Sequence, residues 1–133
     1  MKSPGRREQL QGSDGRMHQD MSESKRRTIT LRDERHGQDA RHLWAYLDED
    51  GNLHIDGQDL GPGTSMVSSD GEYEWYKTVA ASDVPLVVEL LAGEPGENVL
   101  DVLQREWTAA RSYELEARLR GSGIPIALFV YSG

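Results

Sequence analysis

The sequence contains no cysteine, and its N-terminal residues are not followed by any apolar run. The absence of cysteine excludes disulfides, thiolate metal sites and cysteine nucleophiles, and it makes a reducing cytoplasm the simplest compartment. Without an apolar run near the N-terminus, the sequence predicts neither a signal peptide nor a membrane anchor. We therefore expect a cytoplasmic protein, and 133 residues give room for one domain.

Lysine and arginine are missing from a long central segment. Between His42 and Tyr76 the chain has neither residue, although eight carboxylates fall there. The net charge is −8, and residues 43–133 hold 16 acidic side chains against 5 basic ones. A field of this sign repels nucleic acid and anionic membranes, and it attracts cations or a basic protein surface. We expect a protein partner with a basic surface, no nucleic acid and no membrane, unless the charge serves solubility alone.

The N-terminal part of the chain has few side chains able to form a core. Residues 1–27 consist mainly of polar and charged types, which predicts a disordered basic and polar tail. An alternative is a basic arm at residues 25–27 that reaches an acidic partner or the acidic body of its own domain. Residues 28–42 predict a short strand, at 28–31, and a loop.

The segment LDEDGNLHIDGQD is the densest group of polar side chains, and it predicts a β-hairpin within residues 43–59. Its Asp50-Gly51 pair is among the strongest short-range hairpin signals. A two-residue turn at this pair would mix apolar and polar side chains on both faces of the hairpin. A type I turn with a left-handed Gly51 instead pairs Leu47 with Leu53 and leaves one face apolar.

The rest of the sequence predicts two further strands and three helices. The expected strands span residues 73–79 and 125–131, and the expected helices span about 83–92, 97–110 and 113–120. The last strand has the composition of a buried or half-buried one. The predicted fold class is α+β, with a small antiparallel sheet and the helices packed on one face. Residues 43–133 are expected to form this single domain.

Residue types also predict how the helices end and what they expose. Gly93 is placed to end the first helix, and Ser112 is placed to cap the third. Glu116 and Arg120 are four residues apart, so we expect them to pair on the surface of the third helix.

Several short motifs carry a family resemblance. They are Tyr46-Leu47, Asp50-Gly51, Leu60-Gly61-Pro62, Glu74-Trp75, Gly93-Glu94, Val99 to Leu103 and Ser122-Gly123-Ile124-Pro125. In these the chain resembles a family of small acidic uncharacterised proteins from high-GC bacteria, over about two thirds of its length. The motifs are structural in kind, so the resemblance implies a bacterial protein and carries over no catalytic residue.

The acidic segment does not match a calcium loop. In an EF-hand that starts at Asp48, the sixth position must be glycine and the twelfth a bidentate glutamate, but the chain has Leu53 and Asp59 there. His54 and Asp56 share a strand face, although the sequence places no third metal ligand beside them. We expect no metal site and no cofactor.

Two other kinds of chemistry are also weakly supported. A Ser-His-Asp arrangement can be written with Ser68 or Ser69, but neither serine lies in a strand-to-helix nucleophile turn. The last two helices could form a helix-turn-helix, yet the second of them carries Glu114 and Glu116 in a strongly acidic domain, which disfavours DNA binding.

The aromatic side chains give the candidate binding site. The chosen hairpin register places Trp44 and Tyr46 on the face opposite the aliphatic core, and the next strand adds either Tyr73 and Trp75 or Tyr76. The candidate binding residues are Trp44, Tyr46, His54, Asp56, Tyr73 and Trp75. An aromatic patch with an acidic border suits a cationic protein segment.

The leading interpretation is therefore a non-enzymatic protein-binding module that uses an acidic, aromatic sheet face. An inhibitor or immunity-type partner of a basic protein is one concrete form. The alternative is a small enzyme or ligand-binding domain with a pocket between helices and sheet, for which His54 is one candidate residue.

Overall fold

The computed structural model describes residues 26–62 and 72–132. The elements are β1 (Thr28–His36), β2 (Asp39–Leu47), β3 (Leu53–Leu60), β4 (Glu72–Val79), the 3-10 turn η2 (Ala81–Asp83), α2 (Val84–Leu90), α3 (Val99–Glu106), α4 (Arg111–Arg120) and β5 (Ala127–Ser132). The predicted tail up to residue 25, and Ser68 and Ser69, lie outside the described residues.

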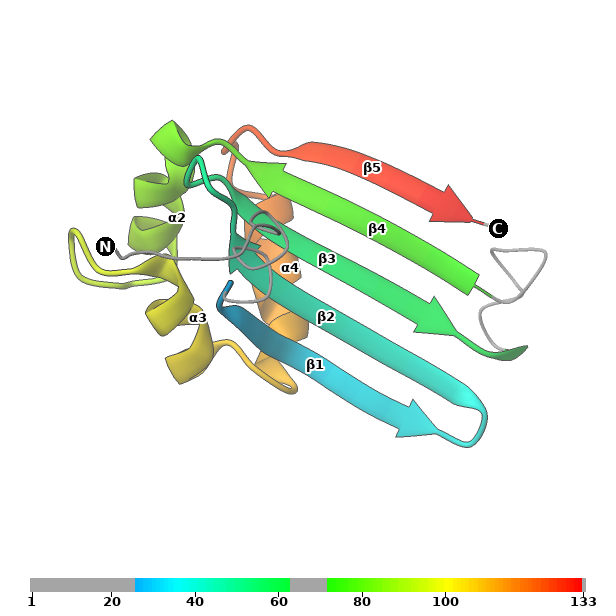
Figure 1. Ribbon diagram of the computed structural model, residues 1–133. Coiled ribbons are helices and arrows are strands. Elements are labelled where there is room, and N and C mark those ends of the chain that lie inside the picture. Colours follow the sequence, from blue (N-terminus) through cyan, green and yellow to red (C-terminus); the bar gives the residue numbers. More distant parts are fainter. Residues whose placement is uncertain (1–25, 63–71, 133) are drawn as a thin grey trace, which may run out of the picture.

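The five strands form one antiparallel sheet in the order β1-β2-β3-β4-β5, which confirms the α+β class (Figure 1). The β2–β3 register pairs Leu47 with Leu53 and Ala45 with Ile55, as the type I turn predicts. In that turn Gly51 has φ +86°, and its N–H donates to the carbonyl of Asp48 at 3.0 Å. The predicted hairpin register is therefore confirmed.

The sheet extends further toward the N-terminus than the 43–133 unit predicted from the sequence. β1 has nine residues and pairs with β2 over most of its length. Ile29 and Leu31 of β1 are almost completely buried in the core, at 4% and 1% exposure. The apolar content of this strand is small, but both of these side chains belong to the hydrophobic core cluster.

The helices and the sheet share one hydrophobic core. In Figure 1, α4 lies behind β2 and β3, while α2 and α3 lie beside one end of the sheet. The core joins inward side chains of four strands to the apolar stripes of the helices: Ile29, Leu31, Leu43, Ala45, Leu53, Ile55, Val79, Val87, Val88, Leu91, Val99, Leu100, Val102, Leu103, Trp107, Leu115 and Leu119. No helix of the described residues is long and apolar enough to cross a membrane.

Two helix ends differ from the expectation. Ala92, rather than Gly93, takes the left-handed conformation after α2, with φ +64°. Gly93 matters for space instead, because a Cβ there would meet Val102 Cγ2 at 2.6 Å. Ser112 does not cap α4, since the helix begins at Arg111 and Ala110 is its N-cap residue.

The predicted burial of β5 is wrong, although the position of this strand in the chain was predicted. Every residue of this strand is exposed, including Phe129 at 64% and Leu128 at 59%. The apolar run was expected to be buried or half-buried, but β5 lies at the edge of the sheet and pairs only with β4. Composition alone does not tell a central strand from an apolar edge strand.

Candidate functional site

The candidate residues of the hairpin lie on one face of the sheet, which we call the outer face. Directly opposite residues of antiparallel strands share a face. Trp44 pairs with Asp56, Asp56 with Tyr76, and Tyr76 with Phe129, which forms one row across four strands. The outer face consists of this row and its neighbours: Tyr46, His54, Thr78, His42, Gln58, Glu74 and Tyr131.

Aromatic rings contact one another along this face. The rings of Tyr46 and His54 stack with centroids 4.7 Å apart and planes within 7°. His42 stacks on Trp44 in the same way, at 5.6 Å and 8°. Tyr76 and Phe129 are 5.9 Å apart and tilted. The face therefore presents a broad aromatic surface, held in place by ring contacts between and along the strands.

Carboxylates are interleaved with these rings. Burial raises the pKa of Asp56, and the nearby His54 opposes this shift. One carboxylate oxygen of Asp56 is buried and has no hydrogen-bond partner among the described residues. The hydroxyl of Tyr76 donates to Glu74, which raises the pKa of Tyr76 to about 12. Gln58 links Glu74 to Glu72 through its amide nitrogen, at 3.2 and 3.3 Å.

Tyr73 and Trp75 are not part of the outer face. Trp75 pairs with Gly57 and therefore lies on the opposite, inner face, as does Tyr73, which pairs with Asp59. The Trp75 indole N–H donates to Glu116 of α4 at 3.1 Å. The sequence left open whether Tyr73 and Trp75 or Tyr76 would join the other candidate residues. The pairing of β4 with β3 puts Tyr76 opposite Asp56, so Tyr76 is the residue that lies on the outer face.

Asp48 organises the turn beside the outer face. One of its carboxylate oxygens accepts from the backbone N–H groups of Asp50 and Asn52, at 2.9 and 3.0 Å. The other lies 2.8 Å from His54 Nε2. The ring nitrogen Nδ1 of His54 is 3.3 Å from the hydroxyl of Thr78. His54 is therefore held in place by its contacts with Asp48, Tyr46 and Thr78.

The pKa of Asp48 lies below its usual value of 3.8, first because of His54 and then because of the bonds from Asn52 and Asp50. A carboxylate whose pKa is lowered by folding stabilises the fold above its unfolded pKa, and this stabilisation is lost as the pH falls through about 4 and below. We expect Asp48→Asn to cost about 1–2 kcal/mol at neutral pH and to weaken the loss of stability below pH 4. Urea unfolding from pH 2 to 7 measures both effects.

Asp50→Asn is the matched control, because it removes the same charge from the same turn at an exposed side chain. If both variants lose equal stability and keep the same pH profile, the contacts of Asp48 do not carry the effect.

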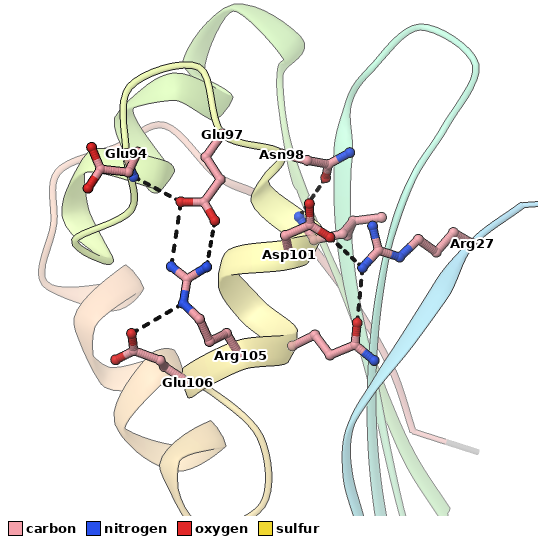
Figure 2. Close-up of polar contacts among 9 residues, drawn as sticks. Arg27, Glu94, Glu97, Asn98, Asp101, Arg105 and Glu106 are labelled. Carbon is pink, nitrogen blue, oxygen red and sulfur yellow. Dashed lines mark hydrogen bonds and ion pairs between the residues drawn. The ribbon is translucent and has the colours of Figure 1, made fainter.

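The chain itself places a cation on the outer face. The guanidinium of Arg26 lies over the ring of Tyr46, 4.4 Å from its centroid. The next residue turns the other way: Arg27 donates to Gln104 of α3 at 3.0 Å and pairs with Asp101 at 2.7 Å (Figure 2). Arg27 thus anchors the segment while Arg26 reaches the aromatic surface. The contacts of Arg26 and Arg27 agree with the alternative of a basic arm that reaches its own domain.

α3 is further braced by ion pairs that Figure 2 shows. Arg105 pairs with Glu97 and Glu106, and Glu97 also accepts from the backbone N–H of Glu94. These contacts hold the loop between α2 and α3 against α3, the helix that Arg27 also contacts.

A buried ionic contact was missed by the sequence reasoning. Arg32 is only 3% exposed, and it donates to Glu116 at 2.8 Å and to Ser112 at 2.9 Å. Its guanidinium also stacks 3.6 Å from the centroid of Tyr113. β1 has a bulge between Thr30 and Arg32, which interrupts the alternation of side chains along the strand. The consecutive residues Leu31 and Arg32 are therefore both buried.

The predicted surface pair of Glu116 with Arg120 is therefore wrong. Ser112, Leu115 and Leu119 are the buried residues of α4, and Glu116 falls on the same stripe. Glu116 accordingly points at the sheet, where Lys77 Nζ lies 3.9 Å from it. Burial lowers the pKa of Lys77, and the carboxylate of Glu116 opposes that shift. The helical period was the signal that could have placed Glu116 inward.

Two pockets lie beside α2, and neither includes His54. One has a volume of about 550 Å³ and is lined by Val84, Pro85, Val88, Glu89, Gly93, Pro95, Gly96 and Glu97. The other is lined by residues of α2 and by the segment that leads into β5. In the described parts of the chain, no three histidine or acidic side chains are grouped to hold a metal ion.

Chemically, the outer face offers aromatic surfaces and hydrogen-bond acceptors.

Comparisons with protein-family models, with curated proteins and with solved structures find no match for this chain.

Proposed function

We propose that this protein is a non-enzymatic binding module whose outer face takes a basic segment of a partner protein. The observation that carries the proposal is the position of Arg26, whose guanidinium stacks on Tyr46 beside the carboxylate of Asp56. Cations stack favourably on tyrosine and tryptophan rings, and charged neighbours add to the attraction. Arg26 is in effect an internal copy of the ligand that we propose.

Further features of the outer face support a basic ligand. Asp56 lies near both Tyr46 and Arg26, so an arginine or lysine side chain that stacked on the Tyr46 ring would lie beside a carboxylate. Glu74 adds a further acceptor beside Tyr76. The proposal takes the helices to lie on the opposite side of the sheet, and the contacts of Glu116 with Arg32 and Trp75 support that placement.

An inhibitor or immunity-type partner of a basic protein is the concrete form of this function. The alternative is a small enzyme or ligand-binding domain with a pocket between helices and sheet. His54, the residue suggested for such a pocket, lines neither of the two pockets beside α2. The strong negative charge of the domain would speed the approach of a basic partner and make its binding sensitive to salt.

We expect a short arginine-glycine peptide to bind the full chain, with an affinity that falls as salt is raised. Arg26→Ala should bind this peptide roughly 2–5-fold more tightly, because the internal cation no longer competes for Tyr46. Asp56→Asn should weaken the binding. Calorimetric titration at low and high salt measures these changes.

Glu89→Gln is the matched control, since it removes an equal charge from an exposed position on α2. A glutamate-glycine peptide tests the sign of the charge. Equal losses in Asp56→Asn and Glu89→Gln, or no tightening in Arg26→Ala, would mean that the peptide responds to net charge and not to the outer face.

A further inference from the structure

The two edges of the sheet differ sharply in chemistry. β1 forms one edge, and its exposed residues include Asp33, Arg35 and His36. It also contains the bulge at Thr30. Charged side chains and bulges are the usual protection of an edge strand against pairing with another chain. β1 thus has the features of an edge that stays unpaired.

β5 forms the other edge and has none of these features. Its sequence, ALFVYS, has no charged residue and no proline. Leu128, Phe129, Val130 and Tyr131 are 59%, 64%, 42% and 50% exposed. Leu128 and Val130 pair with inner-face residues of β4, whereas Phe129 and Tyr131 pair with outer-face residues. The strand is therefore apolar on both faces as well as open along its edge.

We propose that β5 pairs antiparallel with β5 of a second copy of this chain, which joins two sheets into one of ten strands. A strand without charge at the edge of a chain with net charge −8 is the place where two copies meet with the least repulsion. The four apolar side chains expose about 400 Å² per copy, which is half of a standard interface of about 800 Å² per partner. Tyr76, whose ring contacts that of Phe129, is also exposed and extends the apolar surface.

The two-fold axis of such a dimer fixes its register. An axis perpendicular to the sheet sets one residue of β5 opposite its own counterpart and keeps the helices of both copies on the same side. With the axis at Phe129, Leu128 faces Val130 of the second copy and Ala127 faces Tyr131 of the second copy. All five positions then pair apolar side chains on each face. The inference stands apart from the basic partner, although the dimer would join two outer faces into one surface.

The absence of cysteine from the whole sequence allows a direct test. Directly opposite residues in antiparallel strands have Cα atoms about 4.5–5.5 Å apart, which is within the range of a disulfide. We expect Phe129→Cys to form a covalent dimer under mild oxidation, seen on a non-reducing gel. Thr30→Cys is the matched control, because Thr30 lies at the other end of the same cross-strand row.

The cysteine-free chain gives an independent measurement. Sedimentation should give twice the mass of 14.9 kDa for the wild type. Phe129→Lys should give a monomer at the same concentration, because it sets two like charges opposite each other, whereas Thr30→Lys should remain a dimer. Circular dichroism confirms the fold of each variant, and the exposure of Phe129 leaves the core untouched.

Three outcomes would overturn the inference. A wild type that stays monomeric at high concentration would leave β5 unpaired or available to a strand of another protein. A dimer that Thr30→Lys abolishes would place the interface at β1. Cross-linking that is strongest for Val130→Cys would keep β5 as the interface but overturn the register centred on Phe129.

Discussion

Arg32→Ala is expected to destabilise the protein by about 3–5 kcal/mol, the largest single effect that we predict. The substitution leaves the carboxylate of Glu116, whose side chain is 13% exposed, without its main partner. Lys77 Nζ lies 3.9 Å from that carboxylate, which is a longer ion pair than the 2.8 Å contact of Arg32. Arg32→Ala also removes the guanidinium that packs on Tyr113. Removing one member of a buried ion pair is costly because the other charge stays buried.

Companion variants separate this charge effect from a general loss of packing. Arg32→Met with Glu116→Leu should recover part of the stability lost in either single variant, because neither charge of the Arg32–Glu116 pair is then left buried without the other. Arg35→Ala is the matched control on an exposed part of β1 and should stay within about 0.5 kcal/mol of the wild type. Urea unfolding followed by tryptophan fluorescence measures the stability of each of these variants. Losses that simply add in the double variant would show that Arg32 and Glu116 are not coupled.

Gly57→Val is expected to cost about 3–4 kcal/mol. A Cβ at Gly57 would lie 2.2 Å from Cζ2 of Trp75, so the indole would have to leave its place on β3. That movement would break its hydrogen bond to Glu116. The estimate combines overpacking, at about 1–3 kcal/mol, with the loss of a hydrogen bond to a charged group, at about 1.5–3 kcal/mol.

Gly57→Ala brings the same Cβ against the indole but adds no further methyl groups, so it should cost somewhat less, about 2–3 kcal/mol. Its cost should largely vanish in a Trp75→Leu background, because a shorter side chain leaves room for the added methyl group. A thermal or urea double-mutant cycle measures this coupling. If alanine at Gly57 costs the same in both backgrounds, the glycine serves the strand backbone and not the indole.

The parts of the fold that follow from local pattern were predictable from the sequence. The Asp50-Gly51 turn fixed the hairpin register, and the register fixed which residues of β2 and β3 face outward. The helices follow from an equally local period, as in Leu100 and Leu103, which are three residues apart and both buried. In each case the information lies within a few residues, where the side-chain period decides which face is buried.

The parts that depend on long-range neighbours were not predictable in the same way. Arg32 and Glu116 are 84 residues apart, and nothing local indicates that they meet. The inward turn of Arg32 depends on a bulge, and a bulge leaves no clear mark in a strand pattern. Trp75 and Tyr76 could not be ordered by alternation alone, because both faces of β4 carry an aromatic residue. The close fit of Trp75 on Gly57 decides between them.

The place of β5 in the chain also bears on the order in which the protein folds. β1 to β4 pair with sequence neighbours, whereas β5 reaches β4 only after α2, α3 and α4 have been made. Closing a longer segment costs more chain entropy and slows the contacts that it brings together. We therefore expect β5 to join the sheet late. The apolar edge strand β5 then becomes part of an ordered sheet edge only when the rest of the domain has folded. This limits the time in which incompletely folded chains can pair with one another through that edge.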